Sequence, residues 1–353
     1  MQTTEFLLKS FPFPSGAFDD EMKIQVHEET YGDSIDPVAS FIIPVHNQES
    51  MIVGNLELIR EHAALDHEIV VVADGCTDGS LEKIMGWFAK VRDHPARTVR
   101  VVVVDIREGV FETLSDSIGI HLSFSPLIIE IQADMSIQHP GFDEELSEAL
   151  ALNPDVFAIS GRGAHRLSRL PHFRLNSTRL ARMMAALVMR IAKWRNGRRG
   201  TYIPTLAEYL LSDSIGRVGD LVDLPAPVTK SNYLYVHETV MRGPLAFSRD
   251  NYSSLGGFDT SAFFLGNDDH DLILRARIEK RLLAAYLPIR FDSPLEAGST
   301  RALKSPAETL RFQALLSHYG AAERESVLFI QGPNIRSRTR SIRKLPRVRR
   351  ATQ

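Results

Sequence analysis

Short apolar runs rich in β-branched residues alternate with longer segments of helical periodicity along the first half of the chain. The runs cover residues 38–45, 68–74, 99–104, 127–134 and 155–160. Helices are expected over 50–64, after 78–80, from 107 to about 122, and over 142–151; the first carries its apolar residues at helical spacing, at Ile52, Val53, Leu56, Ile59 and Ala63. This order predicts βαβ units and a mostly parallel, Rossmann-like sheet whose strands are buried on both faces.

Polar residues follow the first two predicted strands. Ligands of open parallel sheets bind beyond the carboxyl ends of the strands. Those ends carry Pro44, Val45, His46, Asn47 and Glu49 after the first strand, and Asp74 and Gly75 after the second. A dehydrogenase would place a glycine fingerprint after the first strand, and a nucleotidyltransferase a loop with glycine and lysine. Neither is present, so the sequence predicts a nucleotide site without a glycine-rich phosphate loop.

The composition fits an ordinary globular protein of 353 residues with 44% apolar and 24% charged residues. A net charge of −3 argues against a nucleic-acid partner. The single cysteine, Cys76, excludes an internal disulfide framework and a cysteine-based zinc site, and favours a cytoplasmic location. No apolar run reaches the ~18–20 residues of a membrane span, and the opening residues do not resemble a signal peptide.

The two strand-end segments resemble a known family. Phe41-Ile-Ile-Pro-Val-His-Asn47, followed by Val70-Val-Val-Ala-Asp-Gly-Cys-Thr-Asp-Gly-Ser80, is similar to the opening of family 2 glycosyltransferases with the GT-A fold. His46 stands where the family usually has Tyr, Ala73 where it has the first Asp, and Cys76 where it has Ser. The resemblance implies that Asp74 bonds the nucleotide base and that Ala133 and Asp134 complete the donor site.

The strand over 127–134 ends where the family places its Asp-x-Asp metal motif. Here it reads Gln132-Ala133-Asp134, so one acid remains. The resemblance implies that Asp134 ligates Mn²⁺ or Mg²⁺, with the donor phosphates and waters completing the shell. The alternative is that Asp134 only caps the turn. His318 is a further candidate ligand, although a lone histidine is usually structural.

The most specific passage begins at Arg242-Gly-Pro-Leu245. It continues with Gly256-Gly-Phe-Asp259 and then Asp268-Asp-His-Asp-Leu272 with Arg275. This passage is similar to the acceptor side of family 2 enzymes, with Asp268 where Glu is usual. Acids at a helix N-terminus also have a purely structural explanation, because the helix dipole favours negative charge there. A helix cap does not require the upstream Gly-Gly-Phe-Asp at this spacing.

The resemblance, over roughly residues 38–300, implies a glycosyltransferase that moves a sugar from a nucleotide-diphospho-sugar to an acceptor hydroxyl with inversion. UDP-sugars are favoured by family habit, and the expected acceptors are polysaccharide, lipopolysaccharide or glycolipid precursors. Asp269 is the expected general base, with Asp268 shaping the acceptor site; Gly257, Asp271 and Arg242 also lie on the acceptor side. Neighbouring acids are expected to raise the pKa of Asp269. The alternative function is a catalytically impaired protein of the same fold that binds a nucleotide-sugar or acts as a scaffold.

The expected organisation is a lead-in over 1–37, a GT-A domain over 38–300 and a helical, basic extension over 301–353. A helical insertion spans 162–240 and contains a basic amphipathic helix over 174–199. The tail over 336–350 carries eight basic residues and no acid. Both segments are candidates for contact with an anionic membrane surface. The alternatives are a helix packed on the core, arginines that face an anionic acceptor or the donor diphosphate, and a solvated, disordered tail.

Overall fold

The computed structural model describes residues 24–31, 36–107, 109–165, 183, 187, 214–216, 233–237, 239–240, 242–260, 263, 266, 268–293 and 339–341. His318, the insertion over 162–240 beyond its few described residues, and most of the tail lie outside these ranges. Of the basic helix over 174–199, only Met183 and Leu187 are described; both are helical and exposed. Within the described ranges, no helix has the length and apolar character that crossing a membrane requires.

The predicted alternation of strands and helices is confirmed. The first half contains strands β2 (Ala39–Val45), β3 (His67–Asp74), β4 (Thr98–Ile106), β5 (Leu127–Glu130) and β7 (Val156–Ser160). Helices α2 (Ile52–His62), α3 (Ser80–Val91), α4 (Glu112–Leu122) and α5 (Phe142–Leu152) connect them. Strands β4, β3, β2 and β5 lie next to one another in this order and are mutually parallel. The lead-in contributes β1 (Ile24–Thr30), which pairs antiparallel with β4 at the sheet edge.

The second half of the chain completes the same sheet. It adds β10 (Tyr233–His237), β12 (Leu245–Ser248), β13 (Leu283–Tyr286) and β15 (Thr339–Ser341), in the order β1-β4-β3-β2-β5-β12-β7-β13-β10-β15. Strand β12 lies between β5 and β7 and is antiparallel to both. Strand β15 belongs to the basic tail and pairs with β10. The alternative of a fully disordered tail is therefore wrong for Thr339–Ser341.

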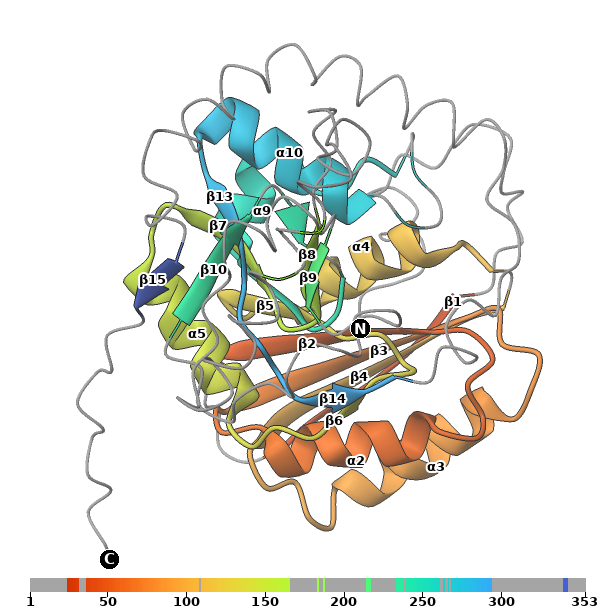
Figure 1. Ribbon diagram of the computed structural model, residues 1–353. Helices are drawn as coiled ribbons and strands as arrows, with labels where there is room; N and C mark the ends of the chain where they lie inside the picture. The colour runs from red at the N-terminus through yellow and green to blue at the C-terminus, as the bar shows by residue number, and fades with distance from the viewer. Residues whose placement is uncertain are drawn as a thin grey trace, which may run out of the picture.

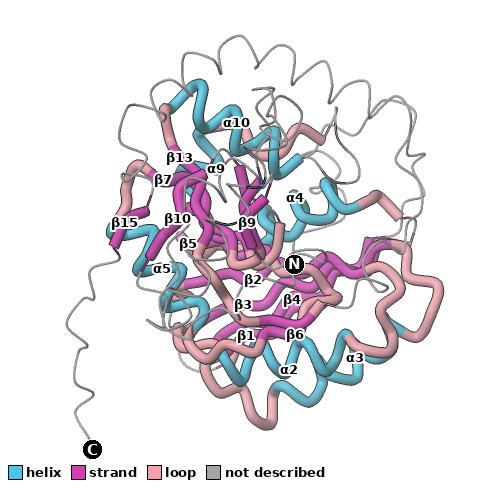
Figure 2. Tube along the Cα trace, viewed as in Figure 1, coloured by secondary structure: helices cyan, strands magenta, loops and turns pink. Residues whose placement is uncertain are grey.

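Two smaller sheets flank the central one. One consists of β11 (Thr239–Val240), β8 (Gly163–His165) and β9 (Ser214–Gly216), and the other of β14 (Phe291–Asp292) and β6 (Ser136–Ile137). Helices α9 (Arg249–Ser254) and α10 (Asp268–Lys280) follow β12. Figures 1 and 2 show α2 and α3 below the sheet, with α4 and α10 above it.

Alternate residues of the buried strands pack into two cores, one on each face. Ile43 and Val71 contact the layer of α2, α3 and α5. Ile42 and Val72 contact the layer that contains α4 and α10. Helix α4 lies very close to the sheet at Gly119, where an added Cβ would come within 2.6 Å of the Ile42 side chain. The strands are therefore buried on both faces, as their continuous apolar runs predict.

Two boundaries differ from the sequence prediction. The helix expected from residue 107 begins at Glu112, because Phe111 adopts a φ of 72° and a ψ of 163°. The strand expected to reach residue 134 ends at Glu130, because residues 132–135 form a turn closed by a hydrogen bond from the Met135 amide to the Gln132 carbonyl (3.0 Å). Both differences place irregular backbone at the carboxyl edge of the sheet.

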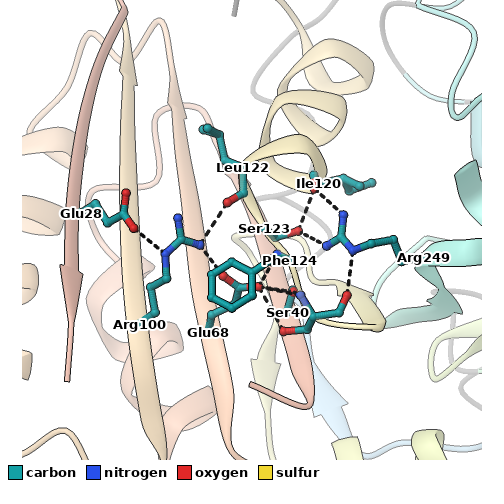
Figure 3. Close-up of polar contacts among 10 residues, drawn as sticks. Glu28, Ser40, Glu68, Arg100, Ile120, Leu122, Ser123, Phe124 and Arg249 are labelled. Carbon is teal, nitrogen blue, oxygen red and sulfur yellow. Dashed lines mark hydrogen bonds and ion pairs between the residues drawn. The ribbon is translucent and has the colours of Figure 1, made fainter. Parts of the chain in front are cut away.

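A polar cluster closes the opposite, amino edge of the sheet. We call Ser40, Glu68, Arg100, Ser125 and Arg249 the amino-edge cluster. Glu68 is fully buried and accepts hydrogen bonds from the Ser40 hydroxyl (2.6 Å), the Ser125 hydroxyl (3.0 Å) and Arg100 (2.5 Å). Arg249 donates to the Ser125 carbonyl (2.8 Å) and to two further acceptors around the end of α4 (Figure 3). The buried charged groups of this edge are all hydrogen-bonded, and these bonds hold the strand ends and the end of α4 together.

Candidate active site

The carboxyl ends of β2 and β3 bring the predicted donor residues together. His46 Nδ1 lies 2.7 Å from the Asp74 carbonyl oxygen. Asn47 accepts a hydrogen bond from the Thr77 amide (2.8 Å), and its own φ of 53° turns the chain away from the sheet. Two loops that are about thirty residues apart in sequence thus form one surface.

Asp74 and Glu49 hold this surface from two sides. The buried Asp74 carboxylate accepts a hydrogen bond from the Val110 amide (2.6 Å), which ties β3 to the segment before α4. Glu49 accepts from the Gly79 amide (3.2 Å) and pairs with Lys83 (3.2 Å) at the exposed start of α3. Of the other predicted donor residues, Val45 is buried in β2, Pro44 is partly buried there, and Gly75 bonds the Ile106 carbonyl (2.7 Å).

Asp134 lies in the turn after β5. Its carboxylate is buried and accepts a hydrogen bond from the Ser293 hydroxyl (3.1 Å). Burial raises the pKa of Asp134, while the Ser293 hydrogen bond and the charge of Arg162 act in the opposite direction. The neighbouring Ala133 carbonyl accepts from the Asn55 amide (2.7 Å), so α2 fixes the turn.

Gln132, two residues earlier, joins two charged side chains. Its amide oxygen accepts a hydrogen bond from the Arg162 guanidinium. Its amide nitrogen donates to Glu112 at the start of α4 (3.3 Å). In this chain, the position of the first acid of the family motif is therefore held by a neutral residue that connects Arg162 with Glu112.

A second charged cluster lies between the sheet and the layer of α4 and α10. We call Arg242, Glu112, Asp116, Glu130 and Asp268 the Arg242 cluster. The guanidinium lies 2.8 Å from Glu112, 3.1 Å from Asp116, 2.5 Å from Asp268 and 3.9 Å from Glu130. All of these side chains are buried except that of Glu112, which is partly exposed.

Four carboxyl groups around one arginine leave an excess of negative charge in a buried space. Burial, reinforced by neighbouring carboxylates, raises the pKa of Glu130 to about 8, although Arg242 acts against this shift. Burial also raises the pKa of Asp116 well above its ordinary value. Glu130 and Asp116 accept no hydrogen bond from any described residue. Burial in this cluster therefore favours the protonated form of Glu130 and Asp116 over the charged form, since both have raised pKa values.

The first turn of α10 presents three acids in different settings. Asp268 is fully buried and faces Arg242, and burial raises its pKa. Asp269 is 6% exposed and accepts a hydrogen bond from the His270 amide (2.8 Å). The sequence predicted a raised pKa for Asp269, and that prediction remains untested.

Asp271 holds the loop before α10. It accepts a hydrogen bond from Arg275 (2.8 Å), and Arg275 also donates to the carbonyls of Leu255 and Gly257 (2.7 Å each). Gly257 has a φ of 75°, and a Cβ there would meet the Tyr252 hydroxyl at 2.9 Å. Arg275 and this glycine therefore fix the Gly-Gly-Phe-Asp loop against the helix.

One continuous set of contacts connects the Asp134 turn with α10. Arg162 contacts Gln132, Gln132 contacts Glu112, and Glu112 shares Arg242 with Asp268. The two regions belong to one carboxyl edge of the sheet. Within the described residues, no group of three His, Cys, Asp or Glu side chains has the arrangement of a metal site.

Sequence reasoning missed four residues of this edge, namely Glu112, Asp116, Glu130 and Arg162. Glu130 gave a usable signal, because it is a lone acid within the apolar run Leu127-Ile-Ile-Glu-Ile131. The other three lie in segments of ordinary polarity. Only the insertion of β12 between β5 and β7 brings them together.

Comparison with known proteins agrees with this architecture. The family model described as glycosyl transferase family 2 matches residues 40–190. The solved structure of GalNAc-T7 with UDP, GalNAc and Mn²⁺ has a TM-score of 0.52 and 12% identity, over 81% of this chain and 48% of that chain. This chain thus spans about half the length of that protein. No curated protein matches this chain.

Two further structures are similar at lower TM-scores. The mannosyltransferase PcManGT from Pyrobaculum calidifontis, in complex with GDP-Man and Mn²⁺, has a TM-score of 0.47 and 17% identity, over 84% of this chain and 76% of that chain. TarS from S. aureus, in complex with UDP-GlcNAc, has a TM-score of 0.46 and 11% identity, over 80% of this chain and 66% of that chain. The GT-A fold and the family 2 resemblance of the sequence are confirmed, the resemblance over residues 40–190.

Proposed function

We propose that this chain, whose residues 40–190 carry the family 2 glycosyltransferase pattern on a GT-A fold, transfers a sugar from a nucleotide-diphospho-sugar to an acceptor hydroxyl with inversion. The observation that carries the proposal is the different environment of the two neighbouring acids at the start of α10. Asp268 is fully buried against Arg242, whereas its neighbour Asp269 retains some exposure at the same helix N-terminus. A base must reach a substrate proton, and Asp269 is the better placed of the two carboxylates.

The reaction follows from this assignment. The Asp269 carboxylate accepts the proton of the acceptor hydroxyl while that oxygen attacks C1 of the donor sugar. The bond between C1 and the diphosphate oxygen breaks with its electron pair on the diphosphate. A single displacement inverts the configuration at C1. Asp268, fixed by Arg242, shapes the acceptor side, and Asp271 supports it through Arg275.

The donor nucleotide is assigned to the ends of β2 and β3. Asp74, His46 and Asn47 would contact the base and ribose there, with Pro44, Val45, Glu49 and Gly75 shaping the same surface. We favour UDP because the family commonly uses it. The sugar would lie between this surface and α10, near Ala133 and Asp134.

The metal that the family resemblance implies finds a poor set of ligands here. Asp134 is the one carboxylate of the motif, and one of its oxygens accepts the Ser293 hydrogen bond. The amide oxygen of Gln132 accepts from Arg162, whose positive charge would repel a divalent cation. These residues do not form a preassembled metal site, so no step of the reaction is derived through a metal. Whether Asp134 ligates Mn²⁺ once a donor is bound remains a prediction.

For the acceptor, we propose a class of molecule and no single compound. Synthesis of polysaccharide, lipopolysaccharide or glycolipid suits a protein with a basic tail, eight basic residues without an acid over 336–350, at an anionic membrane surface. Peripheral association with the inner face of a membrane is the corresponding proposal for location. The substitutions at His46, Ala73 and Gln132 favour one alternative, a nucleotide-sugar-binding protein that has lost catalysis.

The variant Asp269→Asn tests the proposal. We expect its turnover of a UDP-sugar, measured as transfer or slow hydrolysis, to fall by roughly 10²–10⁴-fold, which is the usual contribution of a general base. UDP affinity should remain within about twofold, since Asp269 is assigned to the acceptor side. Asp250→Asn, an exposed acid in the first turn of α9, is the matched control and should keep full activity.

Two outcomes would contradict the proposal in different ways. Unchanged turnover in Asp269→Asn would remove this residue as the base. Binding of UDP- or GDP-sugars by the wild-type protein without turnover of either would support the binding-protein alternative.

A further inference from the structure

Arg162 occupies a position that neither the family pattern nor the proposed base explains. It follows β7, and Gln132 and Asp134 follow β5. Both strands are antiparallel to β12, so their carboxyl ends lie at the same edge of the sheet. Arg162 therefore reaches across the end of β12 to the turn where the family holds the donor diphosphate.

Neutral groups bind both the side chain and the backbone of Arg162. Its guanidinium donates to the amide oxygen of Gln132, and its backbone amide donates to the Ser160 hydroxyl (3.0 Å). Within the described part of the chain, Arg162 forms no ion pair, and its buried Nε has no hydrogen-bond partner. Arg162 lies close enough to Asp134 to act on its carboxyl electrostatically.

The residue at 132 determines how much of that charge is available. An acid there, as in the family motif, would form an ion pair with Arg162 and neutralise it. The amide of Gln132 orients the guanidinium without adding a negative charge beside it. A partly buried guanidinium with unused N–H groups is well suited to bind phosphate oxygens.

We propose that Arg162 binds the diphosphate of the nucleotide donor and supplies the fixed positive charge that the family resemblance assigns to a metal. The ligand class is a nucleoside diphosphate, and the inference rests on the proposed function of the chain. When the sugar departs, negative charge grows on the diphosphate, and a preorganised guanidinium stabilises it without a protein rearrangement.

Binding measurements on the whole chain with UDP, GDP and uridine test the proposal without any need for turnover. In the presence of EDTA, we expect wild-type protein to bind UDP or GDP, and Arg162→Gln to bind the same ligand about tenfold to hundredfold more weakly, as for loss of a charged hydrogen bond. Uridine affinity should not change. A purely structural role for Arg162 would weaken uridine and UDP alike or neither.

The second variant, Gln132→Glu, keeps the shape of the side chain and adds the missing charge. We expect it to weaken UDP binding in EDTA, because the new carboxylate pairs with Arg162. Mn²⁺ should restore part of the affinity in Gln132→Glu and have little effect on the wild type. Arg97→Gln, an exposed arginine at the amino edge, is the control and should bind UDP normally.

The outcomes separate this inference from the proposed function. If UDP or GDP binds and Arg162→Gln binds it as tightly, the inference is wrong and the donor assignment stands. If Mn²⁺ is required for wild-type binding and Arg162→Gln has no effect, the metal-ligand role of Asp134 replaces it. If wild-type protein binds neither nucleotide, the proposed donor class fails as well.

Discussion

The two edges of the parallel sheet treat buried charge in opposite ways. In the amino-edge cluster, Glu68 accepts hydrogen bonds from two hydroxyls, two backbone amides and Arg100. Arg100 also bonds Glu28 and the Leu122 carbonyl (Figure 3). In the Arg242 cluster, four carboxyl groups share one guanidinium, and Glu130 and Asp116 accept no hydrogen bond from any described residue.

The difference separates structural charge from functional charge. A buried ion that is fully hydrogen-bonded stabilises one arrangement of the chain. An excess of buried carboxyl groups raises the free energy of the folded state and persists where the site requires it. The amino edge closes the fold, and the unbalanced charge of the carboxyl edge supports the proposal that the active site lies there.

The largest expected effect is at the amino edge. Arg100→Met leaves Glu68 charged, buried and without its ionic partner, so we expect the free energy of unfolding to fall by about 3–5 kcal/mol. Urea denaturation measures this change. The control, Arg97→Met, removes a partly exposed ion pair with Asp66 and should cost less than about 1 kcal/mol. Equal losses in the two variants would contradict the comparison.

The carboxyl edge should respond in the opposite direction. Glu130→Gln replaces a buried acid by a neutral amide of similar shape, so we expect stabilisation by about 1–3 kcal/mol near pH 8. The pKa of Glu130 is about 8 in the folded protein against an ordinary value of 4.5, so the folded state binds its proton more tightly. The stabilisation that comes from the proton bound to Glu130 is fully present below pH 4.5 and is lost as the pH rises to about 8.

This linkage has a measurable slope. Between pH 4.5 and 8, wild-type stability should fall relative to Glu130→Gln by up to about 1.4 kcal/mol per pH unit, because the unfolded state releases the proton first. Exposed Glu82→Gln reports the effect of removing one charge alone. A constant difference between wild type and Glu130→Gln across this window would show that Glu130 does not hold the proton.

The smallest effect is expected at Phe111, just before α4. Its φ of 72° with a ψ of 163° is a region that only glycine adopts without strain, and its side chain is 41% exposed. Phe111→Gly should raise the free energy of unfolding by about 1 kcal/mol, because relief of strain exceeds the entropy cost of glycine. Phe111→Ala keeps the Cβ and is the control. Equal stabilisation by both would assign the strain to the ring.

The sequence was sufficient to predict the order of strands and helices. Continuous β-branched runs and helical spacing are local patterns, so they can be recognised without knowledge of distant contacts. It also predicted that His46 and Asp74 lie close together, since the carboxyl ends of adjacent parallel strands such as β2 and β3 meet at one edge of the sheet. It could not predict the Arg242 cluster. That cluster requires β12 to pair with β5 in a register where Leu245 faces Glu130. Nor could it predict the positive φ of Phe111, because L-residues with a side chain rarely adopt that conformation.

The position of β12 late in the sequence has a consequence for how the chain can be divided into fragments. Residues 40–190 contain β5 and β7, yet the strand that fills the space between them begins at Leu245. A fragment that ends before this strand would leave two apolar strand edges unpaired, and such edges associate with other chains. We therefore expect the part that matches the family to aggregate when it is produced alone, and to become soluble once the chain extends through α10.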